Sequence, residues 1–253
     1  MMIIKFGGHA MKDSQGLFAK SIKLALSNGD RLIVVHGGGP QINAELAKLQ
    51  IESTFVNGFR FTTEEILTVV ERVLTQMVGP EVASSLNSHG VIAQSISAKE
   101  SGILYAEAID GLGRVGKVSR VDKKSIDALL SLGVVPVIAP IASDVLNGAG
   151  LNINADLAAA AISSAYPDST LIIMTDVAGI YRNWPDQSSL IEEISVSDLE
   201  ALKSTFSDGM LPKVEAVLEA IAAGAHSVRI IDGTSESSFD QALIGIGGTL
   251  VHA

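Results

Sequence analysis

The sequence lacks features that define whole classes of protein. It contains no cysteine, which excludes disulfides, thiolate metal sites and cysteine nucleophiles. Basic residues are few: 18 Lys and Arg stand against 28 Asp and Glu, for a net charge of -10. So acidic a chain offers no sequence-wide surface to nucleic acid. Hydrophobic runs are also short, since Val134 to Ile141 is interrupted by Pro136 and Pro140, and the N-terminal MMIIKFGG is too short for a signal peptide. We therefore expect a cytoplasmic protein without a nucleic-acid or membrane partner.

The hydrophobic residues, 47% of the 253, form short runs that predict strands. These runs are Met2 to Phe6, Leu32 to Val35, Val134 to Ala139, Leu171 to Thr175 and Val228 to Ile231. They do not alternate with polar residues, which is typical of strands buried on both faces of a parallel sheet. Between Ser97 and Arg120 the pattern changes to short β-like pieces with several glycines, which predict a hairpin at the edge of the sheet.

Helical spacing of apolar residues separates these strands. It predicts helices over Ser14 to Ser27, Thr63 to Val78, Asp122 to Leu132, Ala155 to Ala165, Val196 to Lys203 and Met210 to Ala223. Thr62-Thr63-Glu64-Glu65 is a capping start, and Gly29 ends the first helix. The alternation predicts an open α/β sheet whose ligands bind beyond the carboxyl ends of the strands. Tyr166 to Asp168 is the weakest seam, separating two lobes rather than two domains.

Two glycine-bearing turns follow predicted strands. Gly7-Gly8 follows the first strand, and His36-Gly37-Gly38-Gly39-Pro40 lies between the second strand and a helical pattern beginning near Gln41. Glycines let the backbone approach a ligand, and free N–H groups at a helix start favour an anion. The alternative is a pair of tight turns. Neither segment is a Walker sequence or the spaced dinucleotide fingerprint.

Several polar residues lie at positions where a ligand is expected. Arg60 offers a planar fork suited to a carboxylate, although a lone arginine is more often solvated. Asp156 stands one turn into an alanine-rich helix that Asn154 or Asn152 caps. Asp176 follows a buried strand or only opens a turn, and Lys213 lies in a first helical turn, where the dipole disfavours a cation. The five histidines show no metal-ligand spacing, and we interpret them as structural.

Taken in order, the segments IIKFGG, VVHGGGP, NGFRFT, NINADLAA, TDVAGIY with a following NWPD, and GMLPKV resemble the amino acid kinase family and, within it, the N-acetylglutamate kinases. The resemblance runs from the first strand to the final GGTLV. It implies an open three-layer αβα sandwich with a mainly parallel central sheet. An N-terminal lobe, about 1–167, would bind the acyl amino acid and dimerise, and a C-terminal lobe, about 168–253, would bind the nucleotide.

The activity implied by the resemblance is phosphorylation of the γ-carboxylate of N-acetyl-L-glutamate by MgATP, the second step of arginine biosynthesis. A carboxylate is already ionised at neutral pH, so the attacking oxygen needs no general base. Charge neutralisation and positioning are then the main tasks. By resemblance, Lys5 and Lys213 are the catalytic lysines and Asp156 organises them. Magnesium would be held largely by the phosphates of ATP, so we expect no protein metal ligand.

The binding residues are likewise matched by resemblance. Those expected to contact the substrate or the transferred phosphoryl are Gly8, Gly38, Gly39, Arg60 and Asn152. Those expected to flank the nucleotide are Asp176, Val177, Ala178, Gly179, Ile180, Tyr181, Thr205, Phe206 and Ser207. His9 departs from the family, whose members often carry Asn or Ala after the double glycine.

Three alternatives remain beside this interpretation. A kinase acting on an aminoadipate or glutamate side chain of an acidic carrier protein would need a basic rim, which the acidity of the chain disfavours. A non-catalytic ligand-binding relative would not need Lys5, Asp156 and Lys213 together. A NADH-type oxidoreductase lacks its fingerprint here.

The resemblance also bears on assembly. Arginine-inhibited members of the family are hexamers joined through a helix that precedes the first strand. Here Met1 and Met2 run directly into Ile3-Ile4-Lys5-Phe6, so we expect a homodimer with a weak or absent response to arginine.

Overall fold

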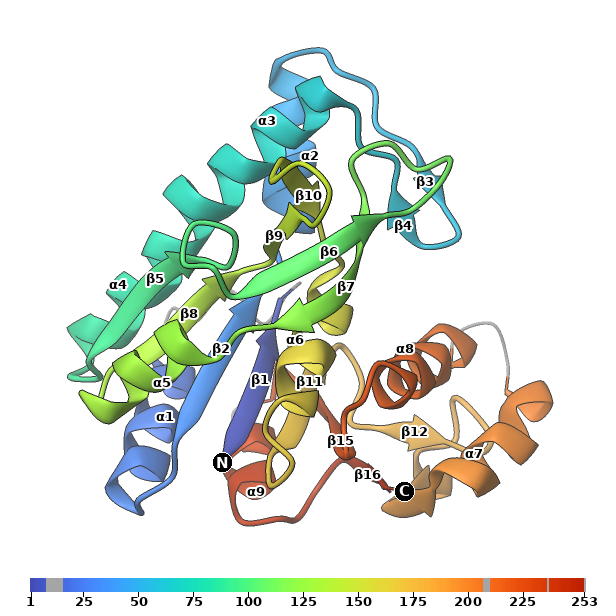
Figure 1. Cartoon of the computed structure of the whole chain (residues 1–253). Helices are drawn as coiled ribbons and strands as arrows, with labels where there is room; N and C mark the ends of the chain where they lie inside the picture. The colour runs from blue at the N-terminus through green and yellow to red at the C-terminus, as the bar shows by residue number, and fades with distance from the viewer. Residues whose placement is uncertain (8–15, 207–209, 236, 253) are drawn as a thin grey trace. The chain divides into compact units, whose positions relative to one another are not determined.

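The computed structural model describes residues 1–7, 16–206, 210–235 and 237–252 of the chain (Figure 1). The chain divides into two compact units. Unit 1 comprises Met1–Arg31 and Ala159–Ala253, and unit 2 comprises Leu32–Ala158. The first 31 residues thus group with the C-terminal part of the chain, which a single division near residue 167 does not anticipate.

Unit 1 is built on a largely parallel sheet of order β14-β16-β15-β11-β1. Only the β15 and β16 pair is antiparallel. The strands are β1 (Met2–Phe6), β11 (Thr170–Thr175), β12 (Ile180–Tyr181), β13 (Leu190–Ile191), β14 (Glu193–Ser195), β15 (Ser227–Asp232) and β16 (Thr249–His252). The helices are α1 (Leu17–Ser27), α7 (Val196–Leu202), α8 (Leu211–Ala222) and α9 (Ser238–Leu243), with 3-10 turns η3 (Gln187–Ser189) and η4 (Lys203–Thr205).

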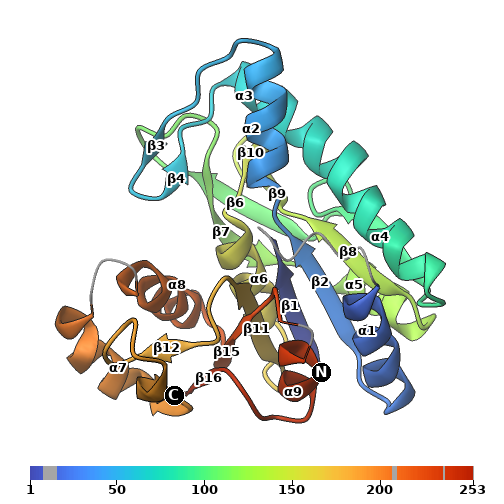
Figure 2. The same ribbon diagram turned by 180° about the vertical axis from the view of Figure 1, so that it is seen from behind.

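Helices cover both faces of this sheet. Figure 2 shows α1 and α9 on one face, and Figure 1 shows α8 on the other. Phe6 of β1 stacks on Phe18 of α1 with ring centroids 4.3 Å apart, and Phe18 lies 5.2 Å from Phe239 of α9. Ile3 and Ile4 are both fully buried although their side chains point to opposite faces. This confirms the prediction of a strand covered on both sides.

Unit 2 has a parallel sheet of order β2-β8-β5 and a second sheet of order β10-β9-β6-β7. Its strands are β2 (Leu32–His36), β3 (Phe55–Val56), β4 (Phe59–Arg60), β5 (Ala93–Ser97), β6 (Leu104–Ala108), β7 (Gly116–Val121), β8 (Val135–Ala139), β9 (Ile141–Asp144) and β10 (Gly150–Asn152). Its helices are α2 (Gly39–Lys48), α3 (Glu64–Arg72), the π-helix η2 (Val73–Val78), α4 (Gly79–Ser88) and α5 (Lys124–Ser131); α6 (Ala155–Ser164) begins in unit 2 and ends in unit 1.

The long helical path through α3, η2 and α4 begins as predicted. The Thr63 side chain accepts a hydrogen bond from the Ile66 N–H at 3.2 Å, which caps α3. Sequence periodicity predicts an uninterrupted helix to Val78, whereas the structure has a π-helix from Val73 to Val78 that continues directly into α4. A π-turn inserts extra backbone into a helix and often occurs at a functional site.

The hairpin expected between Ser97 and Arg120 is present, but its expected place was wrong. Strands β6 and β7 pair antiparallel, and β6 also pairs in parallel with β9, with Tyr105 beside Ser143. The hairpin therefore belongs to the second sheet of unit 2 and not to an edge of the β2-β8-β5 sheet. The reason is the pairing with β9, a strand whose residues form no long apolar run.

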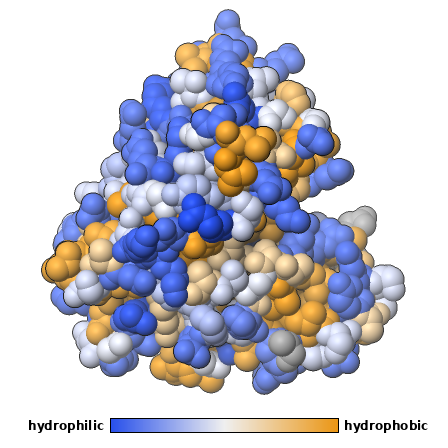
Figure 3. Space-filling model, viewed as in Figure 1, coloured by the Kyte–Doolittle hydropathy of each residue, from blue (hydrophilic) through white to orange (hydrophobic). Residues whose placement is uncertain are grey.

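The surface combines hydrophilic and hydrophobic residues. On the face shown in Figure 3, hydrophobic residues occur in separate groups among hydrophilic ones. Across the described ranges, no helix combines the length and the apolar character needed to cross a membrane.

Candidate active site

The glycine-rich turn after β2 leads directly into α2. Ile42 donates its N–H to the Gly38 carbonyl at 2.8 Å, and Pro40 occupies the first turn, where its missing N–H costs nothing. A Cβ on Gly38 would lie 2.6 Å from Leu74 Cδ2, so this close approach to η2 requires glycine. A Cβ on Gly39 would meet no atom of the described residues within 4 Å. The start of α2 is therefore packed closely at Gly38 and open beside Gly39.

Arg60, at the end of β4, is a buried cation of unit 2. It is only 7% exposed, yet its guanidinium donates to two neutral oxygens, Asn43 Oδ1 at 2.7 Å and Ser53 Oγ. The guanidinium also lies over the Phe55 ring, 4.7 Å from its centroid. Burial lowers the pKa of Arg60, but an arginine side chain stays protonated. In the part of the chain that the structure describes, no carboxylate pairs with this cation.

A buried cation whose described partners are all neutral favours an anionic ligand. Burying a charge is costly unless it is paired, and the remaining N–H groups of the guanidinium fork match a carboxylate. This arrangement distinguishes Arg60 from the solvated arginine that is the usual alternative.

Thr62 connects Arg60 to Asn152, and the sequence analysis missed it. The fully buried Thr62 donates its hydroxyl to the Arg60 carbonyl at 2.7 Å and accepts from Asn152 Nδ2 at 3.1 Å. Asn152, the last residue of β10, also donates its backbone N–H to the Arg114 carbonyl at 2.8 Å. Two predicted substrate residues, 92 positions apart in the numbering, are thus brought together. The signal for Thr62 was its place in the NGFRFT segment.

Asp156 lies in the first turn of α6, and Asn154 is the cap of that helix. Asn154 Oδ1 accepts from the Asp156 N–H at 2.8 Å and from the Leu157 N–H at 3.3 Å. Asn152 does not cap this helix. Its side chain instead donates to Thr62, which is hydrogen-bonded to Arg60. A carboxylate in a first turn is favoured by the helix dipole, so Asp156 also stabilises α6.

In unit 1, Lys213 and Asp176 form an ion pair. Lys213 lies in the first turn of α8, and its Nζ is 3.2 Å from Asp176 Oδ1, just after β11. The Asp176 carboxylate therefore places a negative charge beside this lysine, at a helix start where the dipole disfavours a cation. Lys5, the other predicted catalytic lysine, lies near the end of β1 beside Ile173 of β11.

Thr249 of β16 contacts the segment from Asp176 to Tyr181 near its C-terminal end. The Ile180 N–H donates to Thr249 Oγ1 at 2.7 Å, and a Cβ on Gly179 would lie 2.5 Å from the same oxygen. Ile180 and Tyr181 are buried, and burial, with a smaller contribution from the charge of Asp232, raises the pKa of Tyr181. The side chains of these two residues therefore serve packing. Thr249 carried no sequence signal that could have identified it.

The second predicted nucleotide segment is only partly described. Thr205, which ends η4, is exposed and donates to the Leu202 carbonyl at 2.7 Å, whereas Phe206 is buried. Gly8, His9 and Ser207 lie outside the described residues.

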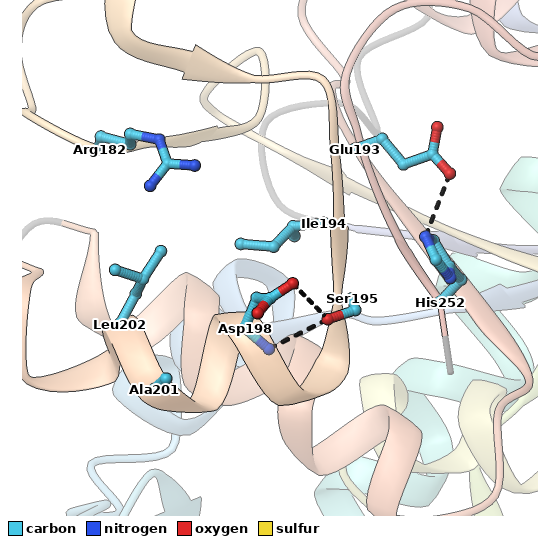
Figure 4. A pocket seen from close by; sticks show the side chains of 8 residues that line it. All are labelled: Arg182, Glu193, Ile194, Ser195, Asp198, Ala201, Leu202 and His252. Carbon is cyan, nitrogen blue, oxygen red and sulfur yellow. Dashed lines mark hydrogen bonds and ion pairs between the residues drawn. The ribbon is translucent and has the colours of Figure 1, made fainter.

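A separate cavity of about 650 Å³ in unit 1 contains none of the predicted site residues (Figure 4). His252 lies 3.1 Å from Glu193 there, and Ser195 donates to Asp198 at 2.7 Å. The lining is completed by Arg182, Ile194, Ala201 and Leu202. Since the polar groups largely bind one another, this cavity is a poor candidate for the site that the sequence predicts. Throughout the described ranges, no group of three or more His, Asp or Glu could hold a metal ion.

Comparison with known proteins identifies the family. The model of the amino acid kinase family matches residues 1–232. The chain belongs to the amino acid kinase family. This confirms the resemblance and the predicted α/β fold class, and it places the chain among kinases.

Relatives in this family match nearly the whole chain. A protein named acetylglutamate kinase from Kineococcus radiotolerans is 42% identical, covering 94% of this chain and 85% of the relative. A protein of the same name from Paenarthrobacter aurescens is 44% identical, covering 92% and 79%. Among solved structures, smu.665 from Streptococcus mutans UA159 has a TM-score of 0.83 at 30% identity, covering 100% of this chain and 98% of that one. Carbamate kinase from Giardia lamblia, at 19% identity and a TM-score of 0.72, shares the fold.

Proposed function

We propose that this amino acid kinase is an acetylglutamate kinase, which transfers the γ-phosphoryl group of ATP to the γ-carboxylate of N-acetyl-L-glutamate in arginine biosynthesis. Relatives more than 40% identical over most of the chain carry that name. The observation that carries the proposal is the buried Arg60, whose described hydrogen-bond partners in unit 2 are neutral oxygens.

Arg60 binds the α-carboxylate of the substrate, and Asn152 holds its backbone polar groups. The guanidinium is already oriented by Asn43 and Ser53, so little freedom is lost when a carboxylate binds. Thr62 sets the distance between the two substrate residues. The open space beside Gly39 leaves room for the substrate next to the start of α2.

In the transfer step, a γ-carboxylate oxygen forms a bond to the γ-phosphorus while the bond from that phosphorus to the bridging oxygen of ADP breaks. The carboxylate supplies the electron pair and ADP takes the leaving pair. Charge builds on the equatorial oxygens, where the ammonium groups of Lys5 and Lys213 and the N–H groups of Gly8 and Gly38 stabilise it. Asp156 holds the two lysines in place. Magnesium would be held largely by the ATP phosphates and would neutralise part of their charge.

The nucleotide lies beside residues 176–181 and 205–207. The pair between Asp176 and Lys213 supports this placement, because it keeps the end of β11 and the start of α8 together. The substrate-binding lobe is assigned to about 1–167 and the nucleotide-binding lobe to about 168–253. The enzyme is further proposed to be a cytoplasmic homodimer, closed twofold symmetry being the commonest form of oligomer.

A hydroxamate assay tests the activity. The purified chain is incubated with MgATP, hydroxylamine and either N-acetyl-L-glutamate, L-glutamate or L-aspartate. The acyl phosphate formed from N-acetyl-L-glutamate is expected to be trapped as a hydroxamate, with much less product from the other two acids. Equal or greater activity on glutamate would overturn the assignment.

A matched pair of variants tests the role of Arg60. Arg60→Gln removes the buried cation and is expected to raise KM for N-acetylglutamate at least about tenfold, since hydrogen bonds between charged groups contribute about 1.5–3 kcal/mol. Arg31→Gln removes an exposed cation of unit 1 and is expected to leave KM unchanged. Equal effects of the two changes would contradict a specific role for Arg60.

A further inference from the structure

The ring of His36 is hydrogen-bonded to the glycine-rich turn that follows it. His36 ends β2, and its Nδ1 lies 2.9 Å from the Gly37 carbonyl oxygen. A carbonyl only accepts hydrogen bonds, so Nδ1 carries the proton and donates. The hydrogen bond therefore fixes the orientation of the Gly37 carbonyl.

The same peptide plane contains the Gly38 N–H. The carbonyl of residue 37 and the N–H of residue 38 belong to one planar trans unit and point in opposite directions. Holding the carbonyl toward the imidazole therefore holds the Gly38 N–H away from it. Within the described residues, no acceptor is found for the Gly38 N–H, and Gly38 itself begins α2 as its N-terminal cap residue.

The imidazole is held firmly by packing. His36 is fully buried, and its Nε2 has no hydrogen-bond partner among the described residues. A Cβ on Gly79 would lie 3.0 Å from Nε2 and 2.4 Å from Ser95 Oγ, so the ring fits closely against the start of α4. Burial lowers the pKa of His36 to about 4, which keeps the ring neutral at working pH.

The π-helix supports the other side of the same turn. Leu74 of η2 packs against Gly38, while the Leu74 carbonyl lies 3.0 Å from a Cβ built on Gly79, the residue beside the His36 ring. Leu74 of η2 thus lies against Gly38 and close to Gly79, the residue that packs beside the imidazole. Nothing in this arrangement requires a polar ring at position 36 except the hydrogen bond to Gly37.

We propose that His36 is a positioning residue that acts through the Gly37–Gly38 peptide, aiming the Gly38 N–H at the transferred phosphoryl group. The inference rests on the proposed function, since it takes the phosphoryl acceptor role of Gly38 from there. His36 itself touches neither substrate nor nucleotide. Its contribution is to remove the freedom of one peptide plane before the substrate binds.

The first test uses the wild-type protein. Long-range 1H–15N correlation spectra distinguish a ring protonated at Nδ1 from one protonated at Nε2. The signals of His36 are assigned as those that are absent from the spectrum of His36→Leu. Protonation at Nδ1 alone is expected, and a ring protonated at Nε2 would overturn the proposal, because Nδ1 could then not donate to Gly37.

The second test compares two variants that differ in one donor. His36→Asn keeps an amide N–H at the same number of bonds from Cα as Nδ1 but leaves a cavity, whereas His36→Leu fills the site without a donor. We expect His36→Leu to lower kcat about 10- to 100-fold with a smaller change in KM, the usual effect of a displaced oxyanion donor. His36→Asn is expected to retain most of the wild-type kcat although its melting temperature is lower than that of His36→Leu.

A purely structural role predicts the opposite order, with activity following stability and His36→Leu the more active variant. That order would overturn the proposal. If only one variant folds, its spectrum serves for the assignment, and the protonation pattern of the wild-type ring still decides the question. Absence of kinase activity in the wild-type protein would instead overturn the proposed function, so the two failures are distinguishable.

Discussion

Mild acidification is predicted to destabilise the folded chain through His36. The side chain is fully buried in unit 2, and desolvation lowers its pKa to about 4 from the ordinary value of 6.5. Its hydrogen bond to Gly37 acts in the other direction but is the smaller effect. Between these two pH values the unfolded chain binds a proton that the folded chain does not, so stability falls as pH falls from about 6.5 towards 4.

The size of the effect follows from the difference between the two pKa values. About 2.5 pKa units at 1.36 kcal/mol each amount to about 3 kcal/mol when the unfolded chain is fully protonated and the folded chain is not. At about pH 5 roughly 2 kcal/mol of this loss is reached. Above pH 6.5 both states carry a neutral ring, and the contribution of His36 to the pH dependence vanishes.

Urea unfolding at about pH 5 and about pH 7.5 measures the loss, with His36→Leu as the reference that lacks a titrating group. The free energy of unfolding of the wild-type protein is expected to fall by about 2 kcal/mol more than that of the variant. Other titrating groups contribute to both proteins and cancel. An equal loss in the two proteins would refute the argument, since the buried ring would then not be the source. His36→Asn serves as a second reference.

Three further outcomes are expected. Lys213→Ala should lower kcat at least about 30-fold, equivalent to about 2 kcal/mol, with little change in substrate KM, as steady-state kinetics will measure; a rise in KM at constant kcat would contradict a role in transfer. Arg60→Lys should raise KM for N-acetylglutamate and leave KM for ATP unchanged, because lysine lacks the bidentate fork, and a weakened ATP affinity would place Arg60 elsewhere. Gly79→Ala should cost about 1–3 kcal/mol in urea unfolding, because its Cβ would lie 2.4 Å from Ser95 Oγ. Adding Ser95→Ala should recover part of that loss, and no recovery would show that the contact with Leu74 or His36 dominates.

Much of the fold follows from local pattern. The buried runs at Met2–Phe6 and Leu32–His36 are rich in Ile, Val and other apolar residues, which favours strands. Thr63 ahead of an amphipathic segment is enough to start α3. Strands that are short and partly polar, such as β5 (Ala93–Ser97), form because of their partners, and β9 likewise shows no signal of its own.

For the site, the sequence by itself determined which residue types are available and, through their order, the family. It marked Asp156 and Lys213 because each is unusual or unfavourable where it stands. It also marked Arg60 by its planar fork, and Asn152 by the resemblance to the family. It did not show that Arg60 is buried between two neutral oxygens, because Asn43 and Ser53 reach it only when α2 and the β3–β4 hairpin come together.

Only the tertiary structure decided the roles of Thr62, Thr249 and His36. Each acts through hydrogen bonds to backbone or side-chain atoms, at distances set by packing across strands or across a tight turn. Hydrophobic periodicity depends on residues that are close together along the chain, so it can be recognised in the sequence. A single polar contact depends on the positions of two segments in space, and no local pattern records it.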